Sequence, residues 1–106
     1  LGADVIRLTR SDSAGAAVFT EVGGAILHRG RPAVPVDLKD PDDHAKVLDL
    51  VAHSDGLIEG FRPGVMERLG LGPETCLARN PALVFARVTG WGQTGPLAPS
   101  VGHDIN

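Results

Sequence analysis

The chain has 106 residues, of which 42% are apolar and 22% are charged, and its formal net charge is −3. This length allows one modest hydrophobic core, and the apolar fraction is typical of a globular domain rather than a disordered segment. The negative charge excludes a general attraction to nucleic acid or to anionic membranes, so we expect neither as a partner. No apolar run approaches the roughly 20 residues that cross a bilayer.

The first predicted element is a strand. LGADVIRL at 1–8 reads as the last turn of a helix, capped by Gly2, followed by a strand at 3–8. The chain thus opens partway through a β-α-β unit, and we expect a fragment that is truncated at both ends. Residues 10–26 are rich in small residues and are predicted to form a loop with a short helix.

The middle of the chain predicts a β-α-β unit. Strands are expected at 33–38 and 57–61, both short and apolar as in parallel sheets. Between them a helix is expected at 41–53, with Asp40 as its N-cap and Pro41 at its first position. Strand, helix and strand in about 30 residues close in the right-handed sense.

Several charged residues flank the predicted strands. Glu59 lies inside an apolar strand, which favours a structural pairing. Arg62 emerges at the carboxyl end of that strand, and Arg68 follows on a short helix at 64–69. Two guanidinium groups there suit a phosphate-bearing ligand through charge-assisted hydrogen bonds, and surface salt bridges are the alternative. The pair Arg29 and Arg31 allows the same two interpretations, solvated surface or anion binding.

Cysteine and histidine indicate no metal site. The single cysteine, Cys76, excludes an internal disulfide and fits a reducing, cytoplasmic compartment. It lies within a predicted helix that begins at 73 and ends at 80, and a packing role is favoured over nucleophilic catalysis there. The four histidines have no metal-ligand spacing with cysteines or carboxylates, and we assign no metal; they are His28, His44, His53 and His103. His44 and His53, on the helix at 41–53, are expected to be solvated.

The last stretch runs from a predicted strand at 83–89 into a loop with four glycines and two prolines before residue 103. Open α/β sheets place ligand chemistry where a strand passes into such a loop. The loop ends at His103, an acid–base candidate, beside Asp104. Neighbouring residues do not face each other, so Asp104 is expected to be structural. Trp91 is expected to pack in the core or against the loop.

TGWGQTGP at 89–96 and GHDIN at 102–106 resemble the family III CoA-transferases (CaiB/BaiF family), and within them the α-methylacyl-CoA racemases. The resemblance extends through LGADVIR at 1–7, VDLK at 36–39, LIEGFRPGVMERLGLGPE at 57–74 and ARNPALVFARVTGWGQTGP at 78–96. It covers nearly the whole chain except residues 11–26, which depart from the family pattern in length and composition.

The resemblance implies an α/β fold: a Rossmann-like, three-layer domain with mainly parallel strands. Residues 1–106 would be a partial CoA-binding domain of a larger protein, which is expected to be a homodimer. The substrate is an acyl-CoA, and no cofactor is expected because CoA is part of that substrate. The family's CoA contacts carry over to Arg10, Lys39, Arg62 and Arg68, and less directly to Arg29 and Arg31.

The racemase resemblance implies an isomerase that interconverts (R)- and (S)-2-methylacyl-CoA thioesters, with His103 as one acid–base group. The family's second group is an aspartate, expected in a segment beyond residue 106. One alternative is a CoA-transferase that moves CoA between carboxylic acids through an aspartyl nucleophile. Transferase relatives resemble the chain less at GHDIN. Another alternative is that residues 1–106 are a CoA-binding fragment, inactive by itself.

Overall fold

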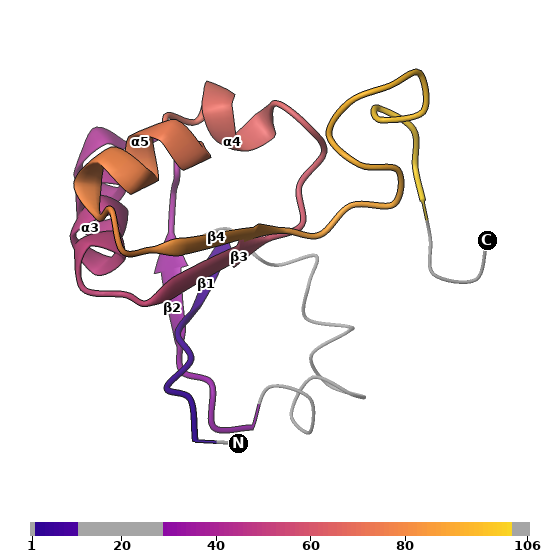
Figure 1. Cartoon of the computed structure of the whole chain (residues 1–106). Helices are drawn as coiled ribbons and strands as arrows, with labels where there is room; N and C mark the ends of the chain where they lie inside the picture. The colour runs from indigo at the N-terminus through magenta and orange to yellow at the C-terminus, as the bar shows by residue number, and fades with distance from the viewer. Residues whose placement is uncertain (1, 11–28, 103–106) are drawn as a thin grey trace. The chain divides into compact units, whose positions relative to one another are not determined.

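The computed structural model describes residues 2–10 and 29–102 and divides into two compact units, Leu1–Asp43 and His44–Asn106. Each unit contains a two-stranded parallel sheet. In chain order the elements are β1 (Arg7–Arg10), β2 (Ala33–Val36), α3 (Pro41–Ala52), β3 (Gly56–Glu59), α4 (Val65–Arg68), α5 (Pro73–Arg79) and β4 (Val84–Arg87) (Figure 1). Within the described residues, no helix has the length and apolar character needed to cross a membrane.

In the first unit, β1 and β2 pair in parallel from Arg7 opposite Ala33 to Arg10 opposite Val36. The strand predicted at 3–8 therefore begins later, because the ladder begins only where the Arg7 N–H donates to the Pro32 carbonyl at 2.9 Å. β2 ends before the predicted residue 38, because the Asp37 N–H is taken by a carboxylate oxygen of Asp43 at 2.8 Å.

Helix α3 begins and packs as the sequence predicts. Its first residue is Pro41, and the Asp40 carboxylate accepts a hydrogen bond from the Asp42 N–H at 2.8 Å, as an N-cap does. Val47 and Val51, one turn apart, are buried at 2% and 3% exposure. This face of the helix therefore packs into the core.

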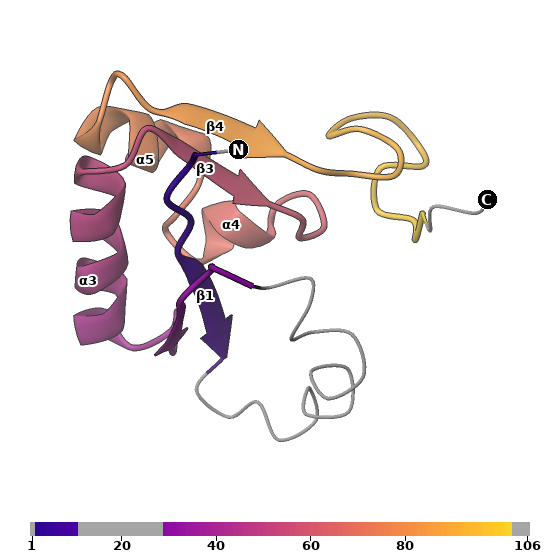
Figure 2. The ribbon, with the colours of Figure 1, turned by 90° about the horizontal axis from the view of Figure 1, so that it is seen from below.

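The core of the second unit lies on one face of the β3–β4 pair, where α4 and α5 cover the sheet (Figures 1 and 2). Its buried apolar residues are Val47, Val51, Met66, Leu71, Cys76 and Leu83, and Ala98 is also buried, in the loop after β4. Cys76 is fully buried, its thiol donates to the Leu71 carbonyl at 3.3 Å, and burial raises the pKa of that thiol. The packing role predicted for Cys76 agrees with this environment.

The two histidines of α3 differ in environment. His53 is exposed, as predicted, and its Nδ1 forms a hydrogen bond with the Asp49 carbonyl at 2.9 Å. His44 is half-buried, and its Nε2 donates to the Gly70 carbonyl at 2.9 Å. The prediction that His44 is solvated is therefore wrong, because the turn after α4 brings a backbone acceptor to this face of the helix.

The parallel strands and helices confirm an α/β fold, with strands shorter than predicted. The four strands form two separate pairs in the structure. A complete three-layer, Rossmann-like domain stays a prediction.

Asn80 joins the end of α3 to the start of β4. Its Nδ2 donates to the carbonyls of Val51 at 3.0 Å and Ser54 at 2.8 Å, and its Oδ1 accepts from the Ala82 N–H at 3.1 Å. One side chain thus satisfies three backbone groups that lie outside regular hydrogen-bond ladders. These three hydrogen bonds hold the chain before β4 against the end of α3.

Substituting Asn80→Ala should destabilise the protein by about 2 kcal/mol, because half-buried backbone groups lose their partners. Asn80→Asp keeps the acceptor for Ala82 but loses both donors, and should cost at least as much. Urea unfolding of each variant measures the change. If Asn80→Ala lowered the free energy of unfolding no more than a substitution at exposed Glu74, the hydrogen bonds of Asn80 would not contribute to stability.

Candidate functional site

Two of the predicted CoA-contacting residues lie at one edge of the β1–β2 pair. Arg10 is the last residue of β1, and Lys39 lies in the turn that follows β2. Because the two strands are parallel, their carboxyl ends share an edge, which is where α/β sheets bind ligands. Both side chains are exposed, and the Lys39 backbone is fixed by its N–H, which donates to an Asp37 carboxylate oxygen at 3.0 Å.

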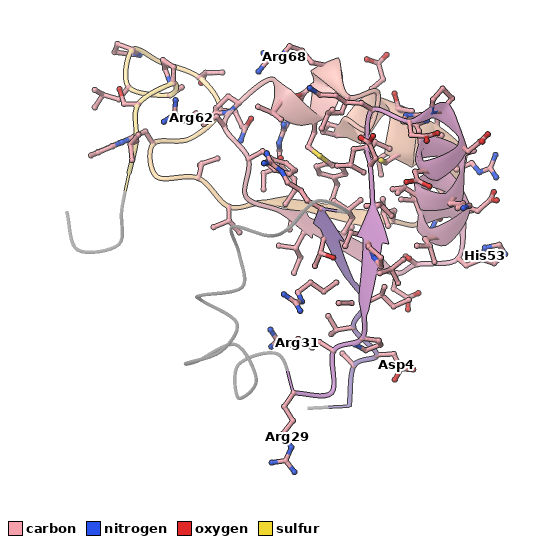
Figure 3. The ribbon with its side chains drawn as sticks, turned by 180° about the vertical axis from the view of Figure 1, so that it is seen from behind. Asp4, Arg29, Arg31, His53, Arg62 and Arg68 are labelled. Atoms are coloured by element: carbon pink, nitrogen blue, oxygen red, sulfur yellow. The ribbon has the colours of Figure 1, made fainter. Side chains whose placement is uncertain are left out.

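The other two predicted residues lie beyond the carboxyl end of β3. Arg62 is in the loop that leaves Glu59, Arg68 is the last residue of α4, and both are exposed (Figure 3). The Arg68 guanidinium rests against Gly64, where an added Cβ would lie 3.0 Å from Arg68 Nη1. Gly64 also has a φ of 88°, which favours glycine. The path of this loop therefore depends on a glycine beside Arg68.

Arg29 and Arg31 lie elsewhere. Both are exposed and precede β2, so they flank its amino end (Figure 3). Arg10 stands at the opposite end of the β1–β2 pair. Within the first unit, the structure does not bring this basic pair to the edge that carries Arg10 and Lys39.

His103 and Asp104 lie outside the described residues, but the loop that leads to them is described up to Gly102. An added Cβ on Gly90 would lie only 2.7 Å from the Gly102 Cα, so the two ends of this loop are in backbone contact. Trp91 Nε1 donates to the Val101 carbonyl at 3.1 Å and reinforces the contact. With 43% exposure, Trp91 packs against the loop and not in the core, which decides between the two predicted roles.

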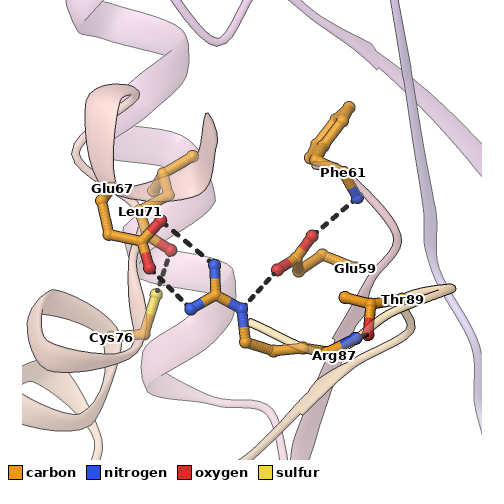
Figure 4. A network of polar contacts seen from close by, with 8 residues as sticks. Glu59, Phe61, Glu67, Leu71, Cys76, Arg87 and Thr89 are labelled. Carbon is orange, nitrogen blue, oxygen red and sulfur yellow. Dashed lines mark hydrogen bonds and ion pairs between the residues drawn. The ribbon is translucent and has the colours of Figure 1, made fainter. Parts of the chain in front are cut away.

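A three-residue ion network lies where β3 and β4 end (Figure 4). Arg87 Nε donates to Glu59 Oε1 at 2.8 Å, across the two strands. Its Nη1 and Nη2 donate to the two carboxylate oxygens of Glu67, on α4, at 2.6 and 3.1 Å. The other Glu59 oxygen accepts from the Phe61 N–H at 2.8 Å. One guanidinium therefore joins both strands to α4.

The network runs from the interior to the surface. The exposed fraction of the side chain is 4% for Glu59, 17% for Arg87 and 46% for Glu67. The hydrogen bonds from Arg87 hold the pKa of Glu67 below its ordinary value of 4.5, and those same bonds raise the pKa of Arg87. Glu59 needs the pair most, because a buried carboxylate without a partner is costly.

The structural pairing predicted for Glu59 is confirmed, but Arg87 and Glu67 were missed. A signal was present in the sequence: Glu59 and Arg87 each interrupt an apolar strand with opposite charges. Only the register of the parallel pair, which sets Glu59 opposite Arg87, shows that the two belong together.

Substituting Arg87→Met should destabilise the protein by about 3 kcal/mol, because the buried Glu59 carboxyl group would lose its partner. The double variant Glu59→Met/Arg87→Met should recover much of that loss, as apolar replacements of buried pairs do. Urea unfolding of the single and double variants gives the coupling. Arg79→Met is the matched control: it breaks an exposed ion pair with Asp49 and should cost under about 1 kcal/mol. Strictly additive effects would contradict the paired arrangement.

Substituting Gly90→Ala should open the loop, because backbone atoms of Gly102 occupy the space that the methyl group needs. Trp91 is the single tryptophan, so its fluorescence should shift to longer wavelength and become more accessible to acrylamide. Gly60→Ala is the control, since its Cβ would meet nothing closer than 3.9 Å. An unchanged emission spectrum in Gly90→Ala would show that the loop ends do not depend on this contact.

Comparison with known proteins supports one family. A family model described as CoA-transferase family III matches residues 1–106. An α-methylacyl-CoA racemase of Mus musculus is 42% identical over 105 residues, which cover 99% of this chain and 26% of the relative. An acetyl-CoA:oxalate CoA-transferase of Acetobacter aceti is 44% identical over 80 residues, which cover 76% of this chain and 21% of the relative.

A solved structure agrees with these likenesses. The crystal structure of a hypothetical protein from Mycobacterium tuberculosis superposes with a TM-score of 0.88 at 37% identity. The match covers 99% of this chain and 31% of that one. The chain thus spans about a quarter of the length of the curated relatives named above.

Proposed function

The chain belongs to CoA-transferase family III, and we propose that the complete protein interconverts (R)- and (S)-2-methylacyl-CoA thioesters. The observation that carries this proposal is an imidazole at position 103, directly after the contact between Gly90 and Gly102. The likeness to the mouse racemase over 99% of the chain supports it. A strand end, a closed glycine loop and a group that titrates near neutral pH suit proton transfer at a carbon acid.

In the proposed reaction, neutral His103 removes the Cα proton, and the C–H electron pair moves into the thioester to form an enolate. A second acid then protonates the opposite face of the carbon, which inverts it. In the reverse direction the two groups exchange roles. We propose that an aspartate outside residues 1–106 is the second group. Backbone N–H groups of the loop before residue 103 are proposed to stabilise the enolate oxygen.

The proposed CoA contacts are the four basic side chains at the strand ends: Arg10, Lys39, Arg62 and Arg68. Guanidinium groups bind phosphate through two parallel hydrogen bonds, whereas Lys39 contributes a mobile point charge. No further cofactor is proposed, since CoA is part of the substrate. A cytoplasmic homodimer is the proposed form of the complete protein.

A CoA-transferase is the second candidate, and the 44% identity to the enzyme of Acetobacter aceti favours it. In that reaction a carboxylate nucleophile attacks the acyl carbonyl and releases the CoA thiolate, leaving a mixed anhydride. The same basic residues would hold CoA, but His103 would have no role as acid or base. In either case residues 1–106 alone would bind CoA without catalysing the reaction.

In the complete protein, His103→Ala should slow deuterium exchange into the Cα position from D₂O by about 10²–10⁴-fold, the usual contribution of a positioned acid–base group. The loss should be greatest for the enantiomer whose proton His103 removes. NMR of a 2-methylacyl-CoA follows the exchange, and calorimetry should show CoA binding unchanged.

The exposed histidine of α3 supplies the control, because His53→Ala removes an imidazole far from the loop in sequence and should leave exchange unchanged. Exchange that is also unchanged in His103→Ala would remove His103 from the mechanism. Transfer of CoA to a free carboxylic acid with no exchange at Cα would establish the transferase instead.

A further inference from the structure

We propose that Arg87 is a positioning residue for the ligand-binding arginines, because one guanidinium holds both ends of the segment that carries Arg62 and leads to Arg68. We call the segment from Glu59 to Glu67, closed by Arg87, the arginine clasp (Figure 4). The proposal rests on the proposed binding of CoA phosphates by Arg62 and Arg68. Arg87 itself has all three of its donating nitrogens on carboxylates and is not proposed to touch the ligand.

The inner end of the clasp fixes the backbone of Arg62. Glu59 receives Arg87 on one oxygen and the Phe61 N–H on the other, so its carboxylate orients the residue before Arg62. The Arg62 carbonyl in turn accepts from the Val65 N–H at 3.2 Å, which starts the turn into α4. A shift of the Glu59 carboxylate would therefore pass through hydrogen bonds to the Arg62 backbone.

The outer end of the clasp fixes α4. This helix has only four residues, Val65–Arg68, too few to be stable without tertiary contacts. Glu67 binds Arg87 with both oxygens, which fixes the orientation of the helix as well as its distance from β4. Arg68 follows Glu67 directly, so the direction in which its side chain leaves α4 is set by the same contact.

The clasp also explains why the carboxylate of Glu67 lies beside a proposed phosphate site. Arg68 is close enough to contribute to the lowered pKa of Glu67, although less than Arg87 does. A negative charge beside a phosphate site weakens phosphate binding. The bond from Glu67 to Arg87, which orients Arg68, gives this carboxylate a role beside the proposed phosphate site. Lysine could not replace Arg87, because a single ammonium lacks the planar fork that serves two carboxylates.

The electrostatic role and the clasp predict opposite changes in CoA affinity when Glu67 is removed. In the complete protein, Glu67→Ala removes a negative charge near the proposed phosphate site. A purely electrostatic role predicts tighter CoA binding, whereas the clasp predicts weaker binding. We expect a loss of about three- to tenfold in CoA affinity by calorimetry, the cost of ordering one released side chain. Alanine favours helix, so low helix propensity would not account for the loss.

Arg87→Lys keeps the charge and leaves a partner for Glu59, so the fold should survive. It should weaken CoA binding by a similar factor, and the double variant with Glu67→Ala should add little, because both break the same contact. Binding of pantetheine, which lacks the phosphates, should be unchanged in an NMR titration. Asp49→Ala, which breaks an exposed pair with Arg79, is the matched control and should not change either affinity.

Three outcomes would overturn the clasp. Tighter or unchanged CoA binding in Glu67→Ala and Arg87→Lys, with weaker binding in Arg62→Ala and Arg68→Ala, would reject the clasp but keep the phosphate site. Equal losses for CoA and pantetheine would mean that Arg87 only supports the fold. Unchanged CoA affinity in Arg62→Ala and Arg68→Ala would remove the phosphate site, and the clasp with it.

Discussion

The second unit depends on a carboxylate that is buried in a two-stranded sheet. Glu59 has a side chain only 4% exposed, and a charge in that position persists only with a partner at hydrogen-bond distance. Arg87 on the neighbouring strand is that partner, and the parallel register sets the two opposite each other. Because the pair lies at the carboxyl ends of both strands, it also sets where the following loops begin. The ion pair that buried Glu59 requires therefore also fixes the position of Arg62.

The loop after β4 is constrained by sterics instead of charge. Gly90 and Gly102 lie so close that neither tolerates a Cβ, and the indole of Trp91 bonds across the same closure. A loop closed in this way returns the chain to the strand end from which it left, as compact surface loops do. In the proposed reaction this arrangement has a chemical context, since the proposed acid–base residue directly follows the closing glycine in the sequence. The loop that carries Arg62 and the loop that closes at Gly102 leave adjacent strands, β3 and β4.

The sequence predicted the elements of this fold better than their limits. The N-cap at Asp40, the helix that follows it and the parallel strands were predicted from local signals. Strand ends were misplaced because they depend on competing hydrogen bonds, such as the carboxylate of Asp43 on the Asp37 N–H. The sequence predicted that Glu59 is paired, because a charged residue interrupts an apolar strand. It did not predict the partners, because Arg87 and Glu67 come together only through the sheet register and the turn into α4. The site residues were assigned by family resemblance, and local pattern alone left surface salt bridges as an equal alternative.

We propose that CoA phosphates bind beside the carboxyl ends of the strands, on arginines oriented by a network that does not itself bind ligand. A crystal structure of the complete protein with CoA tests it most directly. We expect phosphate oxygens on the guanidinium groups of Arg62 and Arg68, with Arg87 still bonded to Glu59 and Glu67. Phosphates bound on another surface, or an Arg87 that has left its carboxylates to contact phosphate, would contradict it.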